Sequence, residues 1–101
     1  MTVATEFHGN VASIILSGNV DYSVQEDIRN ASQQALFGKQ VREIHVDFSE
    51  VNFLDSSVIR ALLTLQKEAD TAGKTLILLS CNDQTREVFE LGGFDRMFTF
   101  R

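Results

Sequence analysis

The sequence is short of cysteine, proline and basic residues: its 101 residues include one cysteine, no proline and only nine Lys and Arg. A single thiol, Cys81, cannot form an intramolecular disulfide or a four-ligand zinc site. The absence of proline excludes a proline-rich linker. With 14 Asp and Glu the net charge is −5, which argues against nucleic acid as a partner, because phosphate binding requires clustered basic side chains.

Long apolar runs are also missing. No stretch reaches the ~18 apolar residues of a transmembrane helix, and the first ten residues lack the pattern of a signal peptide. We therefore expect a cytoplasmic protein without membrane insertion. Hydrophobic residues still make up 44% of the chain, which suffices for one domain over residues 1–101. So small a domain leaves little room for a deep cleft, which favours a binding or switching module over an enzyme.

Hydrophobic periodicity predicts the order of the elements. Strands are expected where apolar residues alternate with polar ones or run continuously, in segments 3–8, 11–16, 41–48 and 75–80, with a short terminal strand at 97–100. Gly9-Asn10 fits a hairpin turn, Gly18-Asn19 is expected to end the second strand, and 49–54 is expected to be a connection.

Helices are expected where apolar residues recur at spacings of three and four, in segments 22–37, 55–73 and 84–91. In the last of these, Val88 and Leu91 are expected to form the apolar side. The order ββαβαβα, with the short terminal strand, predicts an α/β fold with a mixed sheet and helices packed mainly on one face.

Asp55-Ser56-Ser57 is the most informative segment, because it places three small polar side chains at the start of a helix. On the structural interpretation, Asp55 or Ser56 is only an N-cap. On the functional interpretation, a serine here accepts a phosphate, which the positive end of a helix tolerates. Arg60, four residues after Ser56, would then partly offset the added charge, or else is an ordinary solvated arginine.

Three segments together resemble the STAS domain family, the anti-sigma-factor antagonists. These are the strand and helix start from Val46 to Ser57, the segment Gly18-Asn19-Val20-Asp21, and the closing stretch from Val88 to Phe98. The element order matches over essentially the whole chain. The resemblance implies a STAS-like single domain that acts as a monomer or weak dimer.

The same resemblance implies a partner switch. The unphosphorylated domain would bind an anti-sigma factor that is also an ATP-dependent serine kinase, which phosphorylates the serine after the motif's aspartate. That serine is Ser56, with Ser57 as the second candidate, and a metal-dependent phosphatase of the PP2C type would reverse the reaction. Asp21 would help to shape the kinase-facing surface, and its position also fits that of a cap of the following helix.

The sequence departs from the family where glycines usually follow the Asp-Ser-Ser/Thr motif. Val58 and Arg60 stand at those positions and are expected to add bulk beside Ser56. The partner-binding residues are thus predicted to be Asp21, Asp55, Ser56, Ser57, Val58 and Arg60. The substitutions also leave open a STAS scaffold or regulatory subunit of a signalling or transport assembly.

Other chemistry receives little support from the sequence. Ser56 lacks an evident base and oxyanion loop, which argues against a hydrolase triad. His8 and His45 have no obvious metal-binding companions, so no metal or cofactor is expected. A small enzyme or a nucleotide-binding domain is the third and weakest interpretation.

Overall fold

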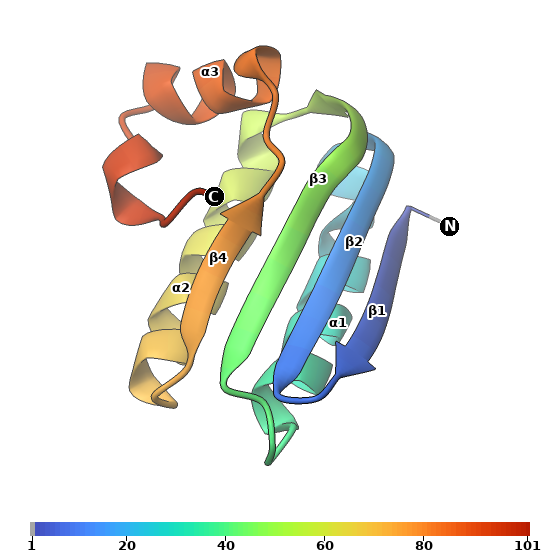
Figure 1. The fold of residues 1–101 in the computed structure, drawn as a ribbon. Helices are drawn as coiled ribbons and strands as arrows, with labels where there is room; N and C mark the ends of the chain where they lie inside the picture. Colours follow the sequence, from blue (N-terminus) through green and yellow to red (C-terminus); the bar gives the residue numbers. More distant parts are fainter. Residues whose placement is uncertain (1) are drawn as a thin grey trace.

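The computed structural model describes residues 2–101, which form a four-stranded mixed sheet and three α-helices (Figure 1). The strands lie in chain order across the sheet: β1 (Val3–His8), β2 (Val11–Val20), β3 (Glu43–Leu54) and β4 (Thr75–Leu79). β1 runs antiparallel to β2, whereas β2, β3 and β4 are mutually parallel. The predicted mixed sheet is therefore confirmed.

Helices cover one face of the sheet. Figure 1 shows α1 (Gln25–Phe37) and α2 (Ile59–Thr71) behind the strands, while no helix lies across the near face. Alternate residues such as Ile14, Ile44 and Leu76 are fully buried between sheet and helices. α3 (Asp83–Leu91) lies beyond the end of β4. The prediction that helices pack mainly on one face is confirmed.

Two strands extend beyond their predicted ends. β2 continues through Gly18-Asn19 to Val20, and β3 includes the segment that was expected to be a connection. Gly18 adopts a φ of +72°, and the register between β2 and β3 shifts on either side of it. Because glycine tolerates this conformation and the irregularity absorbs the misfit, both strands continue past a turn-like sequence.

The first two α-helices begin later than predicted, and the third buries a different side chain from the one predicted. Short 3₁₀ turns, η1 (Tyr22–Val24) and η2 (Ser56–Val58), precede α1 and α2. In α3 the buried aromatic residue is Phe89, whereas Leu91 is 81% exposed. The expectation that Leu91 supplies the apolar side is thus wrong, because three aromatic rings that are distant in the sequence pack on the other side of the helix. These rings belong to Phe48, Phe98 and Phe100, with centroids 5.2–6.2 Å from that of Phe89.

The terminal segment adds a single bridge to the sheet. A 3₁₀ turn, η3 (Asp95–Met97), occupies the start of the predicted last strand, and only Phe100 pairs with β4, opposite Leu78. The Leu78 N–H donates to the Thr99 carbonyl, and the Arg101 N–H donates back to Leu78. The tail thereby covers part of the exposed edge of β4, which would otherwise present unpaired backbone groups.

Candidate functional site

The carboxyl ends of β2 and β3 bring two aspartates to one end of the sheet. Val20 and Leu54 are partners in the parallel register, and each is followed directly by an aspartate, Asp21 or Asp55. The Asp55 N–H donates to the Val20 carbonyl at 2.9 Å, which joins the two loops. Asp21 caps η1 and Asp55 caps η2, so both helical segments start side by side.

Asp55 fixes the turn that carries the predicted phosphoacceptor. Its side chain accepts a hydrogen bond from the Ser57 N–H at 2.9 Å, and its carbonyl accepts one from the Val58 N–H at 3.0 Å. The N-cap interpretation is therefore correct for Asp55. Ser56, the first residue of the turn, is exposed. A cap of this kind does not compete with a role for Ser56, since the cap uses the aspartate and not the serine hydroxyl.

The two serines differ in accessibility. Ser56 lies at the surface, whereas the Ser57 Oγ is buried and has no hydrogen-bond partner among the described residues. The Ser57 carbonyl accepts a hydrogen bond from Gln25 Nε2 at 3.1 Å, which ties the start of α1 to η2. A hydroxyl enclosed in this way is not open to a bulky phosphoryl donor. The structure therefore favours Ser56 over Ser57 as the accessible hydroxyl.

Asp21 is held as a charged cap. Its carboxylate accepts hydrogen bonds from the side-chain hydroxyl and the backbone N–H of Ser23, and these bonds lower the pKa of Asp21 below its ordinary value. The hydroxyl makes the larger contribution. Asp21 is therefore both a helix cap and a negative charge next to the turn that carries Ser56.

Val58 and Arg60 have different environments. The Val58 side chain is fully buried in the hydrophobic core, which corrects the expectation that it adds bulk to the surface beside Ser56. Arg60 is exposed and lines a depression together with Ser56 and Ser57. It forms no ion pair with a carboxylate of residues 2–101. Of the two departures from the family pattern, only Arg60 changes the surface.

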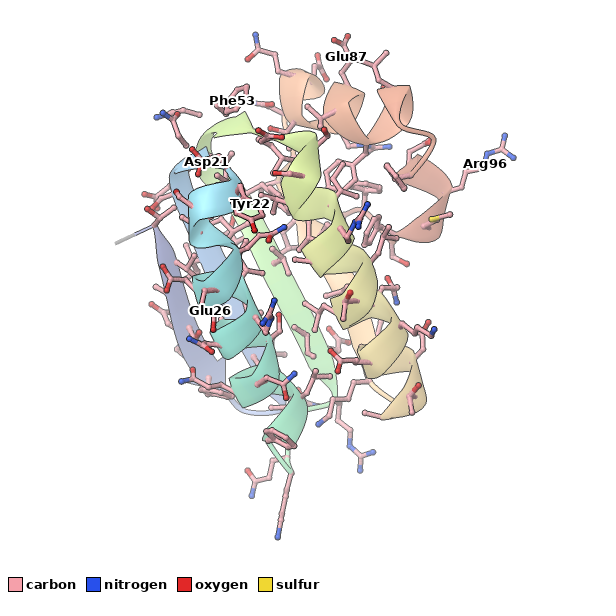
Figure 2. The ribbon with its side chains drawn as sticks, turned by 180° about the vertical axis from the view of Figure 1, so that it is seen from behind. Asp21, Tyr22, Glu26, Phe53, Glu87 and Arg96 are labelled. Carbon is pink, nitrogen blue, oxygen red and sulfur yellow. The ribbon has the colours of Figure 1, made fainter. Side chains whose placement is uncertain are left out.

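Apolar side chains lie beside Ser56, and they were not among the partner-binding residues predicted from the sequence. A second depression beside Ser56 is lined by Phe53 from the end of β3 and by Val88 and Leu91 from α3. Phe53 is 54% exposed and Tyr22, at the start of η1, is 71% exposed. Figure 2 shows Asp21, Tyr22 and Phe53 at the same end of the molecule. The signal available in the sequence was an apolar residue two positions before Asp55.

Other possible chemistry in residues 2–101 concerns metal binding, membrane insertion and the single thiol. No group of three or more His, Cys, Asp or Glu side chains there is arranged to hold a metal ion. Within the same residues, no helix combines the length and apolar character needed to cross a bilayer. Burial raises the pKa of the Cys81 thiol to about 11, despite the opposing charge of Arg86, so this thiol is protonated at neutral pH.

Comparisons with known proteins agree with the fold. The family described as "Mlab, STAS domain" matches residues 3–99. A STAS-domain containing protein of Pseudomonas aeruginosa is 24% identical over 98 residues, which cover 97% of this chain and 95% of that protein. The unphosphorylated form of the anti-sigma factor antagonist SpoIIAA is 26% identical with a TM-score of 0.81, covering 98% of this chain and 87% of SpoIIAA.

A protein with a different described role has the same fold. A sulfate transporter family protein from Wolinella succinogenes is 15% identical with a TM-score of 0.78, and the match covers 94% of this chain and 80% of that one. At this level of identity the likeness concerns the fold alone. The fold is therefore shared by proteins whose described roles differ, so the function has to be argued from the site.

Proposed function

The chain belongs to the STAS domain family, and on this premise we propose that it is an anti-sigma-factor antagonist of a partner-switching pathway. In its unphosphorylated form it binds an anti-sigma factor that is also a serine kinase. Phosphorylation of Ser56 releases that partner, and a PP2C-type phosphatase restores binding. The domain itself acts in the cytoplasm as a regulator and not as an enzyme.

The exposure of Ser56 is the observation that carries this proposal. Ser56 is the exposed serine of the two, it opens a turn fixed by Asp55, and it precedes α2, whose amino end has a partial positive charge. The kinase would transfer the γ-phosphoryl group of ATP to Ser56 Oγ, with release of ADP and of the hydroxyl proton. A phosphatase would hydrolyse the ester to serine and inorganic phosphate.

Local electrostatics explain how one phosphate could break a complex. The modification changes the net charge from −5 to about −7, which is a modest change over the whole chain. Next to Ser56, however, it would add to the charges of Asp55 and the nearby Asp21. Arg60 at the same depression offsets part of this charge. The switch therefore acts at the interface and not through bulk charge.

The apolar side chains around Ser56 supply the contact surface that binding of the partner needs. Phe53 and Leu91 are largely exposed and line the depression that contains Ser56. Exposed aromatic and aliphatic side chains that become buried are typical of binding hot spots. A phosphate placed among them would have to be desolvated on binding, which opposes the complex.

A kinase assay with paired serine variants tests the proposal. With the purified cognate kinase and ATP, Ser56→Ala should lose phosphorylation and keep partner binding, whereas Ser57→Ala should be phosphorylated like the wild type. Phosphorylation of Ser56→Ala to the wild-type extent would show that the site is wrong. Circular dichroism of both variants checks that the fold is unchanged.

The exposed Arg60 favours one alternative. Where the family usually has glycine, a charged side chain stands beside Ser56 and could serve a permanent contact. The domain would then be a scaffold or regulatory subunit of a larger signalling or transport assembly. Phosphopeptide mass spectrometry on protein isolated from its own host separates the two: the alternative predicts no phosphoserine under any growth condition and a stable co-purifying complex.

A further inference from the structure

A cleft with several polar side chains lies between the two helices that cover the sheet. α1 and α2 lie next to each other on the helical side of the molecule (Figure 2). The cleft between them has a volume of about 210 Å³. Side chains of both helices line it, among them the polar residues Arg29, Ser32, Arg60, Thr64 and Glu68 and the apolar residues Ala61 and Leu65.

Ser32 is the buried polar group of this cleft. Its side chain is 5% exposed, and its Oγ has no hydrogen-bond partner among the described residues. A buried hydroxyl without a partner is destabilising unless a bound molecule or ion satisfies it. In the middle of a helix the hydroxyl could bond back to the preceding turn, which Ser32 does not do. Ser32 also lines the cleft, so its unpartnered Oγ would become available to a ligand there once the side chain that covers it moves.

The charged groups of the cleft favour an anion. Within residues 2–101, Arg29 forms an ion pair only with Glu26, at 3.6 Å and between two largely exposed side chains, and Arg60 forms none. Two guanidinium groups thus line the cleft against one carboxylate, that of Glu68, which pairs with neither within 4.0 Å. Guanidinium groups bind phosphate and carboxylate through paired hydrogen bonds.

We propose that the cleft between α1 and α2 binds a small oxyanion of the size of phosphate, held by Arg29, Arg60 and the Ser32 hydroxyl. The volume of the cleft lies below the roughly 300–1,000 Å³ of sites for larger organic ligands, which favours a small anion. The anion accepts hydrogen bonds from both guanidinium groups and from Ser32 Oγ. This site is separate from a phosphate on Ser56 and is expected whether or not Ser56 is modified.

The cleft is nevertheless in contact with the candidate site. Arg60 lines both the cleft and the depression at Ser56 and Ser57. Gln25, at the mouth of the cleft, donates a hydrogen bond to the Ser57 carbonyl. An anion in the cleft would draw the Arg60 side chain away from Ser56, so that binding of the anion and the charge on Ser56 would influence each other.

Titration of the ¹⁵N-labelled chain with inorganic phosphate tests the proposal. Sodium chloride at equal ionic strength serves as the reference, because it screens charge equally, while chloride lacks the oxygen atoms that pair with guanidinium groups. Phosphate should produce saturable shifts of the amide resonances of Arg29, Ser32 and Arg60. Arg29→Gln and Arg60→Gln should each weaken phosphate binding by about tenfold, as expected for loss of a charge-assisted hydrogen bond. Ser32→Ala should weaken it by about threefold.

Two control variants make the test decisive. Lys67→Gln removes one positive charge from α2 outside the cleft, and Ser56→Ala removes the hydroxyl of the candidate site; each should change phosphate affinity by less than about twofold. If Lys67→Gln and Arg29→Gln weaken phosphate binding equally, the effect comes from net charge alone, and the proposal is overturned. Equal weakening by Ser56→Ala and Arg29→Gln would place the anion at Ser56, and absence of saturation would exclude the site.

Discussion

The two ends of the parallel strands are built differently. At the amino ends, Lys74 Nζ donates to the carbonyls of Gly38 and Val41 at 2.7 and 2.8 Å, which ties the loop before β3 to the start of β4. At the carboxyl ends, Asp21 and Asp55 cap separate turns, and the Ser57 Oγ remains buried without a partner among the described residues. The lysine bonds thus hold the amino ends closed, whereas the carboxyl ends present an exposed hydroxyl, that of Ser56, on a capped turn.

Exposed apolar side chains sharpen the contrast. Phe37, near the amino ends of the strands, is 77% exposed. Phe53 and Leu91, near the carboxyl ends, are also largely exposed. Phe53 and Leu91 share a depression with Ser56 and Asp55, whereas Phe37 shares one with Thr71 and Glu68. Apolar exposure beside polar groups therefore does not identify the functional end; the exposed Ser56 on the turn capped by Asp55 does. Phe37 provides the matched control for the tests that follow.

Replacing Phe89 should give the largest effect. Its fully buried ring packs edge-to-face against Phe48, Phe98 and Phe100 and holds α3 and the tail on the sheet. Phe89→Ala should lower the free energy of unfolding by about 3–5 kcal/mol in urea denaturation. Phe37→Ala, at an exposed position, should change it by less than about 0.5 kcal/mol. Similar losses in both variants would contradict the assignment of Phe89 as the anchor of α3.

The exposed apolar residues near Ser56 should matter for binding and not for stability. Phe53→Ser and Leu91→Ser should each weaken partner binding by about 10–30-fold, because truncated hot-spot residues typically cost about 1.4–2 kcal/mol or more. Isothermal titration calorimetry with the purified partner measures this. Phe37→Ser should bind like the wild type; if it loses as much affinity as Phe53→Ser, the docking surface is not confined to the carboxyl ends.

Replacing Lys74 tests how the amino ends of the strands contribute to stability. Lys74→Met keeps the aliphatic stem but removes the two hydrogen bonds to the Gly38 and Val41 carbonyls. Since the site is only partly buried, water replaces part of each bond, and the expected loss is about 1–2 kcal/mol of unfolding free energy. Partner affinity should stay unchanged. A loss of affinity without a loss of stability would reverse the roles assigned to the two ends.

The smallest expected effect is the acid dependence from Asp21. Hydrogen bonds from Ser23 lower the pKa of Asp21 in the folded chain below 3.8, so its contribution to stability is present above that pH and is lost as the pH falls through the folded-state value. Asp21→Asn should therefore lose less stability than the wild type between pH 7 and acid pH. Denaturation at both pH values measures this; an equal or larger loss in Asp21→Asn would refute it.

Much of the fold and the position of Ser56 could be predicted from the sequence, because periodicity records which face of each element is buried. The ends of β2 and β3 could not, because their continuation depends on pairing between them and on a glycine of positive φ within a strand. The orientation of α3 was missed for a similar reason. In a nine-residue helix, Phe89 and Leu91 are equally plausible core residues until the distant Phe98 and Phe100 decide between them.

The candidate site shows the same division. The order Asp-Ser-Ser indicates a helix start, and the cap of Asp55 could be inferred from it. The difference between Ser56 and Ser57 could not, because it arises from burial of the Ser57 hydroxyl and from the contact of Gln25 with the Ser57 carbonyl. Val58 belongs to the apolar stripe that the periodicity predicts for this helix and is buried accordingly, so only its expected role as bulk beside Ser56 was wrong.

The central claim is that charge at Ser56 controls partner binding. The most direct test compares the affinity of the purified kinase partner for the wild type, Ser56→Asp and Ser56→Asn. The two variants have nearly the same size and differ in charge. We predict that Ser56→Asn binds within about threefold of the wild type and that Ser56→Asp binds at least about tenfold more weakly. Equal affinities of Ser56→Asp and Ser56→Asn would contradict the account.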